Sequence, residues 1–135
     1  MAALTDQRQP ASKELGAKTS VPVAASETIY AGSMVNINSA GYAVSATDSG
    51  SDKGKAFGVS VATVDNSAGS NGEKSVILQE GVYSFANHDL TQANLGEDCY
   101  VKDDQTVAAT VANNITAGKL IQYESASAVW VLIRA

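Results

Sequence analysis

The segment Phe57-Gly58-Val59-Ser60-Val61-Ala62-Thr63 alternates large and small side chains with a period of two. Successive side chains of a β-strand point to opposite faces, so this alternation predicts a half-buried strand. Residues 75–79 form a second run, rich in β-branched side chains, and residues 82–85 form a third directly after Gly81. Near the C-terminus, Val129-Trp130-Val131-Leu132-Ile133 is apolar on both faces. This pattern predicts a strand at the centre of a sheet or at a subunit contact.

Shorter segments along the chain have the same strand character. They are residues 20–23, 34–37, 42–45, 99–102, 106–109 and 120–124. No segment offers three turns of helical periodicity, and only residues 90–95 indicate one short helical turn, with Thr91 as its N-cap. About ten short, mainly antiparallel strands with regular turn signals predict an all-β fold, either a compact barrel or a sandwich.

Turn signals separate several of these strands. Asn71-Gly72 lies between the Phe57 run and residues 75–79, and it predicts a type I′ turn because both residue types tolerate positive φ. Ala40-Gly41 separates residues 34–37 from residues 42–45. Asp103-Asp104-Gln105 separates the strands at 99–102 and 106–109 in the same way. We therefore expect hairpins at these positions.

The first residues of the chain differ from the rest. Residues 1–16 lack periodicity and contain Pro10, so we expect a flexible N-terminal arm there and a β domain over residues 17–135. Residues 1–20 carry Arg8, Lys13 and Lys18 against two carboxylates, a net charge of +1. The remaining residues carry six Lys and Arg against twelve Asp and Glu, a net charge of −6. A faintly basic N-terminal segment, residues 1–20, thus precedes an acidic body.

The composition excludes several classes of protein. A chain of 135 residues is about one domain, and a hydrophobic fraction of 44% is enough for a core. One cysteine and one histidine supply neither a disulfide framework nor a Cys/His zinc site. The sequence shows no basic stripe with interleaved aromatic residues, no apolar run near the roughly 20 residues of a membrane span and no apolar signal core. We expect a soluble protein, made in the cytoplasm, that binds neither nucleic acid nor a membrane.

Candidate catalytic residues are few and isolated. His88 lies in a polar segment without a nucleophile-elbow motif, which predicts a surface loop. Cys99 lies within a predicted strand, which indicates a small, buried, apolar side chain. The pairs Glu97-Asp98 and Asp103-Asp104 are immediate neighbours, so their side chains diverge in an extended chain and are typical of turns and solubilising charges. We expect no enzyme activity, no cofactor and no small-molecule substrate.

Two overlapping loop motifs lie in residues 48–55. Residues 50–55 are one residue shorter than a phosphate-binding loop, and Ala56 stands where that motif has its magnesium-binding hydroxyl. Residues 48–52 carry oxygen atoms suited to calcium but lack the EF-hand spacing and its bidentate glutamate. We therefore expect a mobile loop at residues 50–55 and no metal site.

Several stretches, taken together and in order, carry a resemblance to a known family. They are Val21-Pro22-Val23-Ala24-Ala25, Ile29-Tyr30-Ala31-Gly32, Gly41-Tyr42-Ala43-Val44, Gly58-Val59, residues 64–72, Gly81-Val82-Tyr83-Ser84-Phe85, residues 96–108 and Val129-Trp130-Val131. Their order and spacing resemble the small head proteins of tailed bacteriophages and prophages that are encoded beside the major capsid protein. The resemblance covers nearly the whole chain after the first dozen residues.

The resemblance implies a capsid decoration or cement protein. Such proteins are non-enzymatic β modules that bind the outside of an icosahedral shell, commonly as trimers at threefold or quasi-threefold junctions. The implied partners are the major capsid protein and two further copies of this chain, and the implied location is the capsid exterior of the virion. The family offers no catalytic residues to carry over and no cofactor.

Two groups of residues are candidates for contact with the capsid or a partner. The first group is Arg8, Pro10 and Lys13 of the arm, together with Lys18 just after it. We expect the arm to order on binding and to cross onto a neighbouring subunit. We expect Trp130 to lie either in the core or at an intersubunit contact, because it stands in the apolar terminal strand.

A receptor- or glycan-binding β module of a phage head or tail fibre is the alternative. Exposed aromatic side chains on a concave face would favour it. The candidates are the five tyrosines, Tyr30, Tyr42, Tyr83, Tyr100 and Tyr123. Most aromatic residues fall on predicted strands, which indicates positions in the core.

Overall fold

The strands of the protein confirm the predicted all-β class. The computed structural model describes residues 18–135, and nearly all of its regular structure is β. The strands are β1 (Lys18–Pro22), β2 (Glu27–Ile29), β3 (Met34–Asn38), β4 (Ala43–Ser45), β5 (Asp52–Ser60), β6 (Val64–Asn66), β7 (Ser75–Gln79), β8 (Gly81–Asn87), β9 (Asp98–Asp103), β10 (Thr106–Ala108), β11 (Thr116–Tyr123) and β12 (Ala128–Ile133). A single 3-10 turn, Gln92–Asn94, follows the predicted N-cap Thr91.

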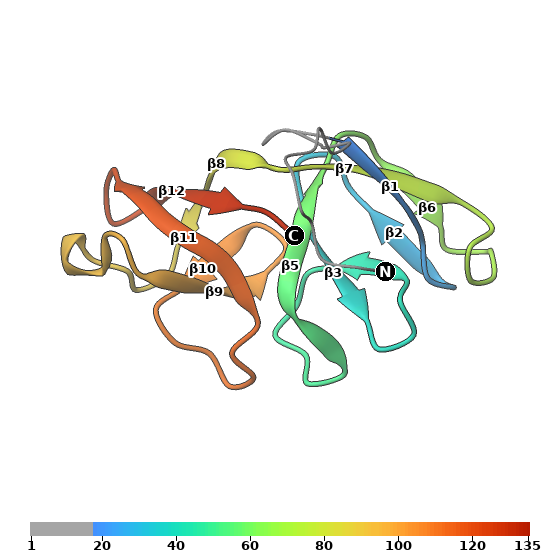
Figure 1. Cartoon of the computed structure of the whole chain (residues 1–135), viewed down its shortest axis with the longest axis horizontal. Coiled ribbons are helices and arrows are strands. Elements are labelled where there is room, and N and C mark those ends of the chain that lie inside the picture. Colours follow the sequence, from blue (N-terminus) through green and yellow to red (C-terminus); the bar gives the residue numbers. More distant parts are fainter. Residues whose placement is uncertain (1–17) are drawn as a thin grey trace, which may run out of the picture.

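The C-terminal half of the chain forms a closed barrel. Its five strands pair in the order β11-β12-β8-β10-β9, and β9 pairs again with β11 to close the ring. Every pair in the ring is antiparallel except β8 with β10. Val129, Val131 and Ile133 of β12 are fully buried inside it, as expected for alternate residues of one strand. Figure 1 shows this barrel on the left.

The N-terminal half forms a second lobe, on the right of Figure 1. The sheet there runs β1-β7-β5-β3-β4, and an isolated bridge between Val23 and Ala43 brings its two ends together. A separate ribbon of β2 and β6 completes the lobe. Its buried core contains the apolar residues Val21, Val23, Ile29, Val35, Ile37, Ala43, Val76 and Leu78.

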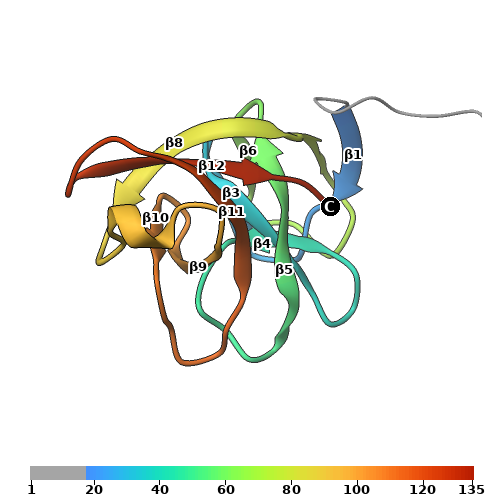
Figure 2. The same cartoon turned by 60° about the vertical axis from the view of Figure 1, so that its left-hand side comes forward.

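Strands β3 and β5 connect the two lobes. β5 pairs antiparallel with β3 and β7, and at Lys55 it pairs in parallel with Thr116 of β11. Figure 2 shows β5 and β11 running side by side. Met34 of β3 is buried in the barrel core, whereas its neighbour Val35 is buried in the other core. This strand therefore supplies one face to each core, since successive side chains point to opposite sides.

The turn predictions have mixed outcomes. β3 and β4 form the expected hairpin, with Gly41 at φ 92°, and β9 pairs with β10 across residues 103–105. The type I′ turn at Asn71-Gly72 is wrong, because only Gly72 has positive φ (77°) and this turn needs it at both residues. Asn71 instead accepts a hydrogen bond from Ala25 N through its side chain, at 2.8 Å. Tertiary contact, and not local preference, therefore sets this turn.

Two strand boundaries also differ from expectation. β5 begins at Asp52, so most of the predicted mobile loop at 50–55 is strand. The same strand ends at Ser60, three residues before the predicted end at Thr63. Its early start comes from pairing with β3 and β11, which are distant in sequence.

Candidate functional site

Trp130 lies on the outer surface of the barrel. It is half-buried, whereas its neighbours Val129 and Val131 are fully buried on the inner face of β12. Its indole Nε1 donates a hydrogen bond to Glu124 Oε1, at 3.4 Å. The core position that was one of the two expectations for Trp130 is therefore wrong, because the period-two alternation of β12 turns this residue outward. The intersubunit contact stays a prediction.

Three further apolar side chains lie on the outer face near Trp130, although its direct cross-strand partners, Ser84 and Gln122, are polar. Residues paired directly across antiparallel strands share a face, and Leu132 is paired with Val82 of β8. Trp130 is paired with Gln122 of β11, next to a bulge that contains Ile121. Val82 is 47% exposed and Ile121 is 44% exposed. We call Val82, Ile121, Trp130 and Leu132 the β12 face.

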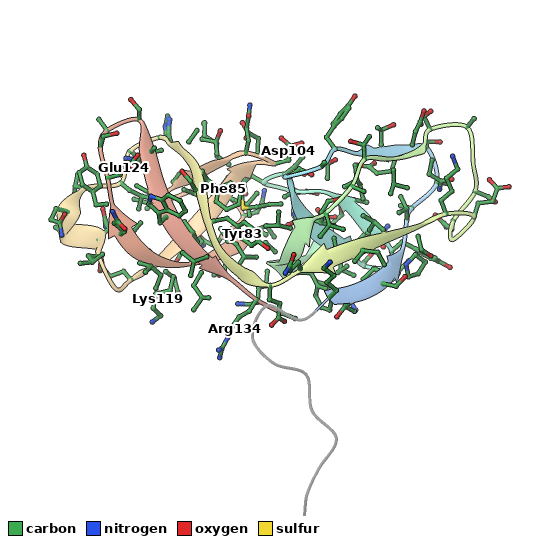
Figure 3. All side chains as sticks on the ribbon, turned by 90° about the horizontal axis from the view of Figure 1, so that it is seen from above. Tyr83, Phe85, Asp104, Lys119, Glu124 and Arg134 are labelled. Atoms are coloured by element: carbon green, nitrogen blue, oxygen red, sulfur yellow. The ribbon has the colours of Figure 1, made fainter. Side chains whose placement is uncertain are left out.

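Charged side chains border the β12 face. Lys119 is paired with Leu132, and Arg134 directly follows β12. Both are exposed, and Figure 3 shows them projecting from the same side of the molecule, away from Glu124. The face therefore combines apolar area with two cations, although the body of the chain is acidic. Such a surface complements a partner surface that is apolar and negatively charged.

A groove lies beside β1, which forms one end of the large sheet. Its volume is about 530 Å³, and Val21, Ile37 and Phe57 supply much of its apolar lining. Lys53 and Lys55 of β5 are exposed at its border. An apolar groove next to a sheet edge can accept an extended segment of another chain.

The expected arm, residues 1–16, lies outside the described residues. Arg8, Pro10 and Lys13 lie there, so the structure does not bring them together with Trp130. Lys18 is described, and it is the exposed first residue of β1, next to the groove residue Thr19. The arm thus joins the body beside the groove.

Cys99 is fully buried in the barrel core, which confirms the prediction of a small apolar role. Its Sγ lies 3.5 Å from the carbonyl oxygen of Gly118. Burial raises the pKa of the thiol to about 12, so the thiolate is scarce near neutral pH. A nucleophilic cysteine needs the opposite shift and an accessible sulfur.

This raised pKa predicts a pH dependence of stability. Between about pH 9 and pH 12 the unfolded thiol ionises while the folded thiol keeps its proton, so the folded state binds more protons and loses stability as the pH rises. The Cys99 contribution to the free energy of unfolding should fall by up to about 1.4 kcal/mol per pH unit in this window. Urea unfolding at several pH values should therefore give a steeper decline for the wild type than for Cys99→Ala. Parallel declines would contradict the prediction.

The other candidate catalytic groups occupy structural positions. His88 is exposed in the loop after β8, as expected. Asp103 accepts a hydrogen bond from Gln105 N at 3.0 Å, which is the predicted turn-forming role. Partial burial, and then the charge of Asp103, raise the pKa of the neighbouring Asp104. Across residues 18–135, no group of three or more His, Cys, Asp or Glu side chains could hold a metal ion.

The carboxylates of residues 48–52 also make structural hydrogen bonds. The two oxygens of Asp48 accept from Ala112 N at 3.0 Å and Asn113 N at 2.9 Å. Asp52 Oδ2 accepts from the buried Asn36 Nδ2 at 3.0 Å. The Asp48 bonds tie the loop before β5 to the segment before β11, and the Asp52 bond ties the start of β5 to β3. The part of the chain that the structure describes also contains no helix with the length and apolarity of a membrane span.

Comparisons with protein-family models, curated proteins and solved structures found no match. The β12 face, the groove and the resemblance of the sequence are therefore the features that bear on function. Sequence reasoning identified Trp130 but missed Val82, Ile121 and Leu132 as its companions. The alternation of β12 predicts that Leu132 shares a face with Trp130, whereas Val82 and Ile121 depend on strand register.

Proposed function

We propose that the chain is a structural virion protein that binds the outer surface of a phage capsid and stabilises it. In this proposal three copies assemble at a threefold or quasi-threefold junction, and the major capsid protein is the partner. The protein is made in the host cytoplasm and ends on the capsid exterior. It is not an enzyme and needs no cofactor.

The observation that supports this proposal best is the β12 face. Groups of apolar residues on a protein surface mark interaction sites, and tryptophan is enriched among the residues that dominate binding. Lys119 and Arg134 at the border would orient the face on a negatively charged partner. Many such contacts around a symmetric shell reinforce one another, so each interface can be small.

Co-sedimentation with capsid shells tests the proposal, together with the mass of the isolated protein. We expect binding to mature, expanded shells and a mass of three chains, either free or after docking. A stable monomer that ignores capsid shells would overturn the proposal. Shells that lack decoration should also become more resistant to heating when the protein is added, because a clamp across neighbouring subunits opposes their separation.

Deleting residues 1–16 should sharply reduce capsid occupancy, by about tenfold or more. In the proposal, the arm of one copy lies in the groove beside β1 of a neighbouring copy. Residues 1–17 can span at most about 60 Å, which is long enough to reach an adjacent subunit. Quantitative gel analysis of sedimented shells measures the occupancy of the deletion variant.

A scrambled arm is the matched control for this deletion. It keeps the length and composition of residues 1–16 but changes their order, so restored occupancy would indicate that docking does not require a specific arm sequence. Occupancy that is unchanged by the deletion would show that the arm takes no part in docking.

Phe57→Ala in the groove should weaken trimer formation in the full-length chain, because Phe57 lines the groove.

Glycan binding is a second candidate function, favoured by the exposed side chain of Tyr30. Tyr30 is 62% exposed, and it shares a shallow pocket with Asp104 and Gln105. An aromatic ring beside planar polar side chains suits a sugar ring. By contrast, Tyr83 and Tyr123 pack partly against the barrel core. Binding of the isolated protein to a glycan array would favour this alternative over capsid docking.

A further inference from the structure

The loop between β6 and β7 is closely bonded to the turn that follows β1. Gly72 N donates to Val23 O at 2.9 Å, and Ser26 N donates to Gly69 O at 3.3 Å. The side chain of Asn71 accepts from Ala25 N in the same region. These bonds give the loop a defined shape, and Asn66, Gly69 and Glu73 line a solvent-open pocket of about 240 Å³ within it.

Asn66 is the buried polar residue at the base of this pocket, with 1% of its surface exposed. Its Nδ2 donates to Ala24 O at 2.9 Å, to Ser70 O at 3.1 Å and to Val23 O at 3.4 Å. Carbonyl oxygens accept but never donate, so these three partners fix which end of the amide is nitrogen. Asn66 Oδ1 is consequently fixed as well, and this buried oxygen has no hydrogen-bond partner.

Glu73 brings a carboxylate to the same place. Its Oε2 accepts a hydrogen bond from Ser70 N at 3.1 Å, which holds the side chain over the loop. A Cβ built on Gly69 would collide with both Asn66 Oδ1 and Glu73 Oε2, so both oxygens pack against Gly69 and lie close to each other. Lys74 lines the pocket but donates its Nζ to Asp65 O at 2.6 Å. Two acceptors therefore lie close together, and a positive ion that contacts both of them on the side away from Gly69 would relieve their repulsion.

We propose that this loop binds a calcium ion through Asn66 Oδ1 and the Glu73 carboxylate. Calcium takes carboxylate, amide and carbonyl oxygens in irregular geometry, whereas magnesium demands a near-ideal octahedron. Asn66 Oδ1 is buried and Glu73 is exposed, so solvent reaches the ion from the Glu73 side of the pocket and water completes the coordination sphere there. One carboxylate and a nearby lysine make the site weak, with a dissociation constant on the order of 0.1–1 mM.

Calcium at this position would stabilise the N-terminal lobe. Asn66 is bonded to Val23 and Ala24, and this segment closes the sheet of that lobe through the Val23–Ala43 bridge. An ion that fixes Asn66 and Glu73 therefore couples the β6–β7 loop to the end of β1. The site is independent of the proposed capsid function, since neither the β12 face nor the arm takes part in it.

Thermal unfolding of the metal-free, full-length protein tests the proposal. Calcium chloride at about ten times the dissociation constant should raise the Tm by about 4 °C relative to sodium chloride at equal ionic strength. Glu73→Gln should abolish this rise, because it removes the only carboxylate ligand. Glu97→Gln, an equal charge change at an exposed residue before β9, should retain it.

Three results would overturn the calcium site. The first is an equal Tm in the calcium and sodium salts for the wild type. The second is a calcium response in Glu73→Gln as large as in Glu97→Gln, which would indicate general screening of an acidic protein. The third is an equal response to magnesium chloride. Calorimetric titration with calcium chloride should likewise give heat of binding for the wild type and Glu97→Gln but not for Glu73→Gln.

Discussion

Gly118→Ala should destabilise the protein by about 3 kcal/mol or more, the upper part of the range for overpacked sites. Gly118 is buried in β11, and a Cβ at this position would collide with the carbonyl oxygen of Leu132 in β12. That oxygen belongs to the backbone of a strand whose pairing with β11 continues at Lys119 and Leu120. It cannot move away without disturbing the closed barrel. Urea unfolding monitored by the fluorescence of Trp130, which lies on β12, measures the effect.

Gly54→Ala is the matched control for this substitution. Gly54 is exposed in β5, and a Cβ there meets no atom within 4 Å. Its φ lies outside the left-handed region, so alanine fits the backbone, and the change in stability should stay within about 1 kcal/mol. Similar unfolding midpoints for the two variants would mean that the barrel adjusts around Gly118 more freely than its backbone contact indicates.

Local patterns predicted the strands well where burial follows a simple period. Residues 75–79 coincide with β7, and Val76 and Leu78 point inward while Ile77 is exposed. The terminal run at 129–133 falls within β12 and has its predicted central place between β11 and β8. In both strands the buried side chains recur at every second residue. The sequence is apolar at consecutive positions there, so it predicted the strands but not which face is buried.

Long-range pairing was not visible in the sequence. The ribbon of β2 and β6 was missed because each strand has a single apolar residue, Ile29 or Val64, and pairs with a segment distant in sequence. The early start of β5 comes from β3 and β11, and the closed barrel depends on the pairing of β9 with β11. Such contacts depend on register and closure, which the local sequence does not specify.

In the candidate site, too, the local sequence predicted some features and long-range pairing determined the others. The sequence indicated Trp130 and the apolar character of its strand, but it left both a core and a surface position open. The bulge between Leu120 and Gln122 decides where Ile121 points, and the pairing of β8 with β12 brings Val82 beside Leu132. The buried Asn66 was missed entirely, because an asparagine in a Ser/Gly-rich segment is typical of a solvated turn.

Trp130→Ala should greatly reduce capsid binding while lowering the stability of the fold only a little. Trp130 is half-buried on the outer surface, so its truncation should cost the monomer less than the 3–5 kcal/mol of a core tryptophan, about 1–2 kcal/mol. Its bond to Glu124 is exposed and adds little. Capsid occupancy should nevertheless fall by about thirtyfold, the loss expected for a residue that dominates an interface. Co-sedimentation of the folded variant with capsid shells measures this loss.

Val131→Ala should do the opposite: it should lower the stability of the fold without weakening capsid binding. Val131 adjoins Trp130 in sequence but is fully buried in the barrel, so its truncation should cost about 2 kcal/mol of stability. The folded fraction of this variant should still bind shells at wild-type occupancy, because its β12 face is unchanged. If both variants lose occupancy in proportion to their loss of stability, the β12 face is not a docking surface. A direct contact is supported only if Trp130→Ala loses more capsid occupancy than its loss of stability explains. Val131→Ala supplies the comparison, because it lowers stability without changing the β12 face.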